Sequence, residues 1–499
     1  MAIGSRLTRH GLRSELATHV GFNGLAQVAP MIVTLAITPF LLDRLGLDRF
    51  GVWALALVVM GTLTALDGGI SASLARYFAI YAARDDRVET GRLLVGALVF
   101  SVVFGGVLTA LAWPVAPTAV ELLDIPAGLD DEAVFVLRCL PALAALGLAA
   151  DSTTALLQGN GRFRALAISM FGSSGVFAVA VIVLVQPGAS LRPLMVATAL
   201  RYLVLLLVGL FSAAPHVVVR RPLLPSLETT RDLGRFASRM QLSALTGFVN
   251  SELDVLVIAA VLPVRYVGLY AIGLQAASAA RSLPLYVFAP VLTRLAATFR
   301  RDGRTAAVAE FERFERTWFP TVLAYGIVAV SAIGFAVPIW LGDRYELSGA
   351  VAALLLFGFI VHVALTGMRT CYVRAIGEPG LEARYSFVWM VGNALLTVPL
   401  ALAFGVLGVV ASTVISGVVA SVYFVFLCRE REGLRTIVPG RRWWLLGVAG
   451  AAATVAGELA VASTGLHGFG ALALAALPPL VALSFYAMGL RPSWRPTPA

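Results

Sequence analysis

Long apolar stretches alternate with short polar segments along almost the whole chain, from Val20 to Leu490. The hydrocarbon core of a bilayer is roughly 30 Å thick, so a helix needs roughly 20 apolar residues to cross it. By that length, the pattern predicts an all-α, polytopic membrane protein with about 14 transmembrane helices. The predicted spans are 20–42, 50–83, 93–115, 132–157, 165–186, 193–214, 236–262, 267–298, 318–341, 348–373, 386–404, 409–428, 443–463 and 469–490.

The arginines are distributed unevenly over the loops between these spans. Loops on one side, together with both tails, carry 26 of the 38 Arg, whereas loops on the other side carry five. Cytoplasmic loops of membrane proteins are enriched in positive charge. We therefore expect the Arg-rich side, including both termini, to face the cytoplasm.

The composition excludes several classes of protein. The chain has no Lys, so it lacks the phosphate-binding Lys of a P-loop ATPase. Its net charge of +10 is spread over short loops, which favours membrane topology over nucleic-acid binding. Three Cys and five His form no spaced cluster, so we expect no disulfide, no metal site and no cofactor. The outer loops are too short for a catalytic domain, and we name no catalytic residue.

Two short motifs recur at nearly the same offset in the numbering. Gly51 and Gly268 lie in the similar segments 50–55 and 267–272, and their offset is 217. Gly159 and Gly377 follow spans 4 and 10, and their offset is 218. Six spans separate the copies, and because six is even the copies share one orientation, as in parallel-repeat transporters. The alternative is a chance match between Gly-rich apolar segments.

The repeat predicts two six-helix lobes and two further C-terminal helices. The longest inner loop contains Pro215, Pro222 and Pro225 and is typical of a linker. The expected organisation is a basic cytoplasmic N-terminus at 1–19, a first lobe at 20–214, a cytoplasmic linker at 215–235, a second lobe at 236–428, helices 13 and 14 within 429–490, and a cytoplasmic tail at 491–499.

Span 7 carries a polar stripe on an otherwise apolar helix. At 100° per residue its members fall within an arc of about 80°; they are Arg239, Ser243, Thr246, Asn250 and Asp254. Span 1 has residues at the same angles, each displaced by 216: Asn23, Gln27, Pro30, Thr34 and Thr38. Polar side chains at this depth must face protein or water, so we expect both stripes to line a cavity. Hydrogen bonding between packed helices is the alternative.

Charged residues at mid-depth differ between the halves. The first half has Asp67 and Asp151, whereas Arg281 and Arg369 lie in the second half, with Arg369 at the repeat offset from Asp151. Our hypothesis is that an anionic substrate headgroup binds to Arg281, assisted by Arg239, Arg369 and Arg201, because a guanidinium pairs with phosphate oxygens through two parallel donors. An acid would then couple transport to H+ or Na+; the candidates are Asp67, Asp254 and Asp151. Permanent ion pairing between the lobes is the alternative.

Several segments resemble a known family. Residues 38–53, followed by 66–69 and 75–77, resemble the start of bacterial polysaccharide flippases of the Wzx type. The turns at Gly159 and Gly377 are also similar, and the resemblance covers roughly residues 20–430. It implies the fold of the multidrug/oligosaccharidyl-lipid/polysaccharide exporter superfamily, in which two six-helix lobes enclose a central cavity that opens alternately inward and outward.

The resemblance also implies a function. Such proteins move undecaprenyl-pyrophosphate-linked oligosaccharides across the bacterial plasma membrane, commonly with an ion gradient, so the expected partners are a lipid-linked oligosaccharide, H+ or Na+, and membrane lipid. We expect a monomer that acts alone or beside polysaccharide-assembly enzymes. Lipid II flippases carry an Arg-Asp pair early in helix 1. Asn23 and Gln27 stand in that helix here, which argues against lipid II.

Other functions are left open by the residues. A multidrug/cation antiporter shares the fold, but the mid-depth arginines argue against it. Asp130 and Asp131 would suit a membrane glycosyltransferase or polysaccharide polymerase, because paired acids bind metal or act as a base. A scaffold for a polysaccharide synthase is a further alternative. The charged stretch 306–316 is expected to form an amphipathic helix on the cytoplasmic surface.

Overall fold

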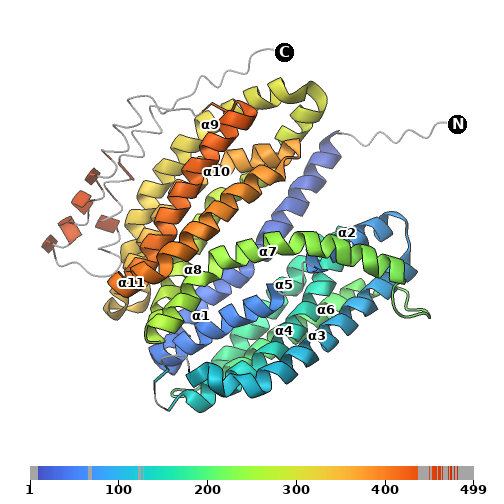
Figure 1. Cartoon of the computed structure of the whole chain (residues 1–499), viewed down its shortest axis with the longest axis horizontal. Helices are drawn as coiled ribbons and strands as arrows, with labels where there is room; N and C mark the ends of the chain where they lie inside the picture. Colours follow the sequence, from blue (N-terminus) through green and yellow to red (C-terminus); the bar gives the residue numbers. More distant parts are fainter. Residues whose placement is uncertain are drawn as a thin grey trace. The chain divides into compact units, whose positions relative to one another are not determined.

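The computed structural model describes residues 9–65, 70–121, 125–126, 128–435 and scattered positions between 449 and 481 (Figure 1). Within that part, the side chains of 9–29, 65, 70–72, 236–251 and 289 are not described. Every regular element in the described residues is helical, so the predicted all-α class is confirmed. The chain divides into two compact units. The first comprises residues 1–252 and 262–268, and the second comprises 253–261 and 269–499.

Six helices and most of a seventh form the first unit. They are α1 (Arg9–Ala65), α2 (Ile70–Ala83), α3 (Arg87–Glu121), α4 (Asp130–Gly159), α5 (Phe163–Leu184), α6 (Arg192–Ala213), the short η1 (Ala214–His216) and most of α7 (Leu227–Val261). Helix α4 packs against α3, α2, α6 and α1, and α5 packs against α6 and α1. Residues 217–226 connect η1 to α7. They contain Pro222 and Pro225, two of the three prolines of the predicted linker.

The second unit contains four long helices beyond the end of α7. They are α8 (Arg265–Leu285), α9 (Phe288–Leu341), α10 (Glu346–Ile376) and α11 (Pro379–Glu432), with the short η2 (Asp343–Tyr345) before α10. Helices α9 and α11 each consist of two arms that meet at Gly303 and Gly405, where φ is +80° and +62°. The chain can turn there because glycine adopts positive φ without a Cβ clash. Helix α10 packs against α9 and α11.

The same helices recur in both units in the same order. Helix α1 also has two arms, which meet at Gly46, where φ is +76°. The repeat offset places its second arm on α8, α2 and α3 on the two arms of α9, α4 on α10, and α5 and α6 on the two arms of α11. The repeat-related Gly51 and Gly268, both in the first unit, approach each other so closely that a Cβ on Gly51 would lie 2.2 Å from the Val264 carbonyl oxygen.

Eight helical segments in the described part are long and apolar enough to cross a membrane. Many large apolar side chains on them are exposed, such as Val102 at 71% and Leu402 at 71%. Such surfaces fit a lipid environment, because lipid-facing helices need no apolar protein cover. The chain is therefore a multi-pass membrane protein. The count of about 14 spans stays a prediction, since helices 13 and 14 lie mostly outside the described residues.

Two local predictions differ from the structure. The predicted single span 267–298 is interrupted, because α8 ends at Leu285, directly after Pro284, and α9 begins at Phe288. Proline lacks the N–H that would continue the helical ladder. The stretch 306–316 is not a separate surface helix: it is the start of the second arm of α9, and its Glu315 is buried, at 2% exposure.

Candidate functional site

A buried polar cluster lies in the second unit around Asp254, near the C-terminal end of α7. The Asp254 side chain is buried, at 3% exposure, and meets side chains from three other helical segments. Tyr270 comes from α8, Asn393 from the first arm of α11, and Thr413 from its second arm. The turn at Gly405 brings these two arms back alongside each other, so that residues 20 apart in sequence reach one carboxylate.

Hydrogen bonds to Asp254 come from three neutral donors. The Tyr270 hydroxyl donates to Oδ2 at 2.6 Å, and Asn393 Nδ2 donates to Oδ1 at 3.1 Å. The Thr413 hydroxyl also donates to Oδ2. The Asn393 amide oxygen accepts in turn from Thr397 at 3.1 Å and from Ser412 at 3.3 Å. A carboxylate and an amide oxygen are thus held in place by a network of hydroxyl groups.

No ion pair to Asp254 occurs among the side chains that the structure describes. A buried carboxylate without a positive partner is costly unless it binds a proton or a cation. Carboxylate, amide and hydroxyl oxygens are the donors that hard cations prefer. The Asp254 cluster, defined by Asp254, Tyr270, Asn393, Thr397, Ser412 and Thr413, can therefore bind H+ or a small cation.

One face of α10 carries polar and aromatic groups. Phe359 lies under the Arg281 guanidinium, whose central carbon is 4.4 Å from the ring centroid. His362 Nδ1 is 2.9 Å from the Ser421 hydroxyl, and the His362 ring lies 4.7 Å from that of Trp389. Arg281 is half-buried, and its Nε has no hydrogen-bond partner among the described residues. One buried donor of this guanidinium is thus left without a partner.

Arg369 lies ten residues after Phe359 on α10, about 15 Å along the helix axis. Its Nη1 is 2.6 Å from Glu315 Oε1, and the two side chains are 1% and 3% exposed. Nη1 also donates to the Leu365 carbonyl at 2.6 Å. Nε and Nη2 of Arg369 are buried without a hydrogen-bond partner in the described part of the chain. The predicted anion-binding residue Arg369 is therefore already paired with a carboxylate here.

Two other predicted residues lie in the first unit. Arg201 on α6 is half-buried, and its guanidinium lies 5.7 Å from the Phe177 ring and 5.9 Å from the Tyr202 ring. Cation–π contacts of this kind stabilise a guanidinium away from water. Asp151 on α4 is half-buried. These two residues stay predictions for substrate binding and ion coupling.

Comparisons with known proteins identify the family. A family model described as "Polysaccharide biosynthesis protein" matches residues 43–349. The chain belongs to the polysaccharide biosynthesis protein family. A Shigella flexneri protein named provisionally as an O-antigen transporter is 20% identical over 370 residues, which are 72% of this chain and 85% of that protein. The resemblance to Wzx-type flippases is confirmed at this level.

Solved structures place this family member in a known fold. An inward-facing multidrug resistance MATE family transporter of the MOP superfamily has a TM-score of 0.69 at 17% identity and covers 82% of this chain and 98% of its own. The lipid II flippase MurJ in an inward closed conformation has a TM-score of 0.64 at 13% identity and covers 94% and 99%. The fold is that of transporters of this superfamily, as predicted.

Several predicted site residues lie outside the described part of this polysaccharide biosynthesis protein. Asp67 is not described, and the backbones of α1 and α7 are described without the side chains of Asn23, Gln27, Arg239, Ser243 and Asn250. The sequence reasoning also missed residues that the structure brings together, namely Tyr270, Asn393, Thr397, Ser412, Thr413 and Glu315. Asn393 and Thr397 are four residues apart in an apolar span, so a search for polar stripes in every span would have found them.

Proposed function

We propose that this chain flips a polyprenyl-(pyro)phosphate-linked oligosaccharide from the inner to the outer leaflet of the bacterial plasma membrane. Transport proceeds by alternating access, in a monomer with both termini in the cytoplasm. Family membership on a transporter fold is the observation that carries this proposal, since polysaccharide assembly requires lipid-linked intermediates to cross a membrane. The names of the Shigella protein and of MurJ agree with it.

Arg281 is proposed as the main contact for the substrate phosphates, assisted by Arg239 and Arg201. Arg369 could assist only in a state in which it is released from Glu315. The Arg281 guanidinium rests on Phe359 and has an unused Nε donor. Such a group pairs with two phosphate oxygens at once and stays charged in a low dielectric. Asn250, Ser243, Asn23 and Gln27 are proposed to bind sugar hydroxyls from the stripes on α7 and α1.

The Asp254 cluster is proposed to couple transport to an ion gradient. Its two hydroxyl groups and one amide N–H donate to a single buried carboxylate in the second unit. H+ and Na+ both suit this set of ligands. Binding of either ion would remove the charge of the buried carboxylate and so stabilise one state of the transport cycle over another. Asp67 and Asp151 are further candidates for coupling or for pairing between the lobes.

The experiment uses purified full-length protein in vesicles, a fluorescent lipid-linked sugar, and a proton or sodium gradient. Arg281→Ala should slow flipping about tenfold or more, which is ~1.4 kcal/mol. Arg281→Lys should retain part of the activity, because the charge remains but the two-point geometry is lost. Arg300→Ala, an exposed position in the same unit, is the control. Wild-type flipping by a normally inserted Arg281→Ala protein would contradict the role of Arg281.

A multidrug/cation antiporter is the second candidate, favoured by the likeness to a MATE transporter. The same vesicles distinguish the two. Export of a cationic dye with no flipping of the lipid-linked sugar would support the antiporter. Flipping without dye export supports the glycan substrate. Flipping that requires added assembly enzymes would indicate a scaffold role.

A further inference from the structure

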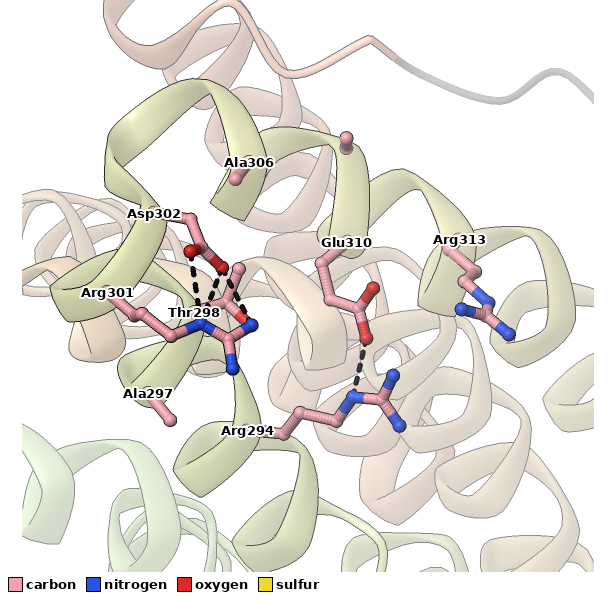
Figure 2. Close-up of a pocket in the computed structure, with 9 residues that line it drawn as sticks. Arg294, Ala297, Thr298, Arg301, Asp302, Ala306, Glu310 and Arg313 are labelled. Atoms are coloured by element: carbon pink, nitrogen blue, oxygen red, sulfur yellow. Dashed lines mark hydrogen bonds and ion pairs between the residues drawn. The ribbon is translucent and has the colours of Figure 1, made fainter. Parts of the chain in front are cut away.

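A pocket lies between the two arms of α9, at the turn around Gly303. Figure 2 shows Arg294 and Arg301 extending from the first arm and Glu310 and Arg313 from the second. The pocket has a volume of about 690 Å³. Lining residues follow helical spacing on each arm, and small side chains, including Ala306, leave the space between the arms open.

The guanidinium groups around this pocket are oriented by carboxylates but keep free donors. Arg294 Nε is 2.6 Å from Glu310 Oε1, so its two terminal amino groups remain available. Arg301 Nε and Nη2 donate to the Asp302 carboxylate at 2.8 to 3.0 Å, which leaves Nη1 for a ligand. Arg313 has no ion-pair partner among the residues that the structure describes. Three guanidiniums and two carboxylates leave an excess of one positive charge.

The corresponding place in the first unit is filled by the protein itself. The offset between Gly51 and Gly268 also places Arg301, Asp302 and Arg304 on Arg84, Asp85 and Arg87, so the charged turn is present in both copies. The neighbouring residues differ: Arg294, Glu310 and Arg313 correspond to Tyr77, Leu93 and Gly96. Leu93 belongs to an apolar core cluster of the first unit, and Tyr77 packs against that cluster.

In the first unit, the linker also covers the place that corresponds to the α9 pocket. The Val218 N–H donates to the Arg87 carbonyl at 2.9 Å, and Arg92 Nε donates to the Pro222 carbonyl at 3.0 Å. A Cβ on Gly96 would lie 2.9 Å from Pro225 Cδ, so the linker packs directly on α3. The same turn is therefore covered by the linker in the first unit, whereas in the second unit the described residues around it are charged and line a pocket.

We propose that the α9 pocket binds a phosphate group at the membrane surface. Three guanidiniums on two sides of one gap match the several oxygens of a phosphate, and their free N–H groups are the donors that such oxygens accept. The turn belongs to the Arg-rich side of the chain, where basic pockets meet the headgroups of anionic lipids. This site is separate from Arg281 and the Asp254 cluster, and it does not depend on the proposed flipping activity.

The test measures phosphate binding by the full-length protein in detergent micelles. Native mass spectrometry counts bound phosphatidic acid, with a diacylglycerol of equal chain length as the phosphate-free comparison. A separate titration with inorganic pyrophosphate follows the unfolding temperature. Arg313→Gln should weaken binding about tenfold or more, and Ala306→Leu should remove it by filling the gap without changing a charge. Arg300→Gln removes an exposed Arg outside the pocket lining and should bind as the wild type does.

Each outcome decides the proposal. Binding of phosphatidic acid alone, with loss in Arg313→Gln and Ala306→Leu, assigns the pocket to a lipid headgroup. Binding of pyrophosphate with the same losses assigns it to a phosphate group regardless of its source. Equal binding by all variants, equal binding of the diacylglycerol, or no binding of either probe would overturn the inference. Circular dichroism of each variant verifies that the helices are intact.

Discussion

At the position where the second unit holds Asp254, the first unit holds Thr38. The other members of the cluster also change, at offsets of 217 or 218: Tyr270 corresponds to Trp53, Asn393 to Gly175 and Thr413 to Met195. Trp53 and Met195 are 5% and 4% exposed, so the first unit is packed with apolar groups there. One helical framework thus supports apolar packing by Trp53 and Met195 in one copy and a hydrogen-bonded buried carboxylate in the other.

This difference shows which buried positions of the fold accept polar side chains. Helix packing is preserved when Thr or Tyr takes the place of Met or Trp, provided that the space stays filled and each buried polar group has a hydrogen-bond partner. The Asp254 cluster meets the second condition with bonds among Asp254, Asn393 and Thr413. Four changes, ordered by expected effect, test how far the comparison holds.

Arg369→Leu should have the largest effect. It leaves the Glu315 carboxylate buried and unpaired, which costs about 3–5 kcal/mol in the free energy of unfolding. The measurement is chemical unfolding in detergent micelles. The double variant Arg369→Leu with Glu315→Leu should return close to wild-type stability, because apolar groups of similar size replace a buried pair at little cost. In the first unit, Asp151 stands at the position of Arg369 and Leu98 at that of Glu315. An equal loss of unfolding free energy in Asp151→Leu would show that the two units do not differ in this respect.

Asp254→Asn should abolish the response to an ion gradient while preserving the shape of the cluster. We expect gradient-driven flipping to fall about 100-fold, which is ~2.7 kcal/mol, because an amide cannot take up a proton or balance the charge of a cation. The vesicle assay with and without a gradient measures this. Thr38→Val, the matched change in the first unit, should leave coupling unchanged. If Asp254→Asn still responds to the gradient, another acid must be the coupling group.

Gly51→Ala should destabilise the first unit by roughly 1–3 kcal/mol, since overpacking displaces backbone. The added Cβ would lie 2.2 Å from the Val264 carbonyl oxygen. Gly268→Ala, the repeat-related change, should cost less, because its closest contact is the Leu47 side chain at 3.1 Å. Gly61→Ala is the control, with open space around it. The unfolding temperature in detergent is measured for all three variants. An equal shift for Gly51→Ala and Gly61→Ala would contradict the close approach of Gly51 to Val264.

Thr413→Val should have the smallest effect. It removes one hydrogen bond to Asp254 and preserves side-chain shape, so stability should change by about 1 kcal/mol, and the apparent ion affinity by less than tenfold. Thr198→Val in the first unit removes a bond to the Leu194 carbonyl only. It should leave ion dependence unchanged. A change in ion dependence in Thr198→Val as large as that in Thr413→Val would show that the effect is not specific to the cluster.

The sequence predicted the features that depend on local pattern. Apolar length indicated the helical class, and the spacing of Gly51 and Gly268 indicated the repeat, because both are properties of continuous segments. Asp254 was found through the stripe on span 7. Its partners were not, because Tyr270, Asn393 and Thr413 meet only after the Gly405 turn and the packing of three segments are known. Glu315 was assigned to a surface helix, since its burial depends on Arg369, 54 residues away.

Val218 and Pro222 hold the linker on α3 of the first unit through two hydrogen bonds. This stretch of the connecting peptide is therefore part of the first unit's surface and is not a free tether. Deleting residues from it should cost the first unit stability as well as shorten the connection.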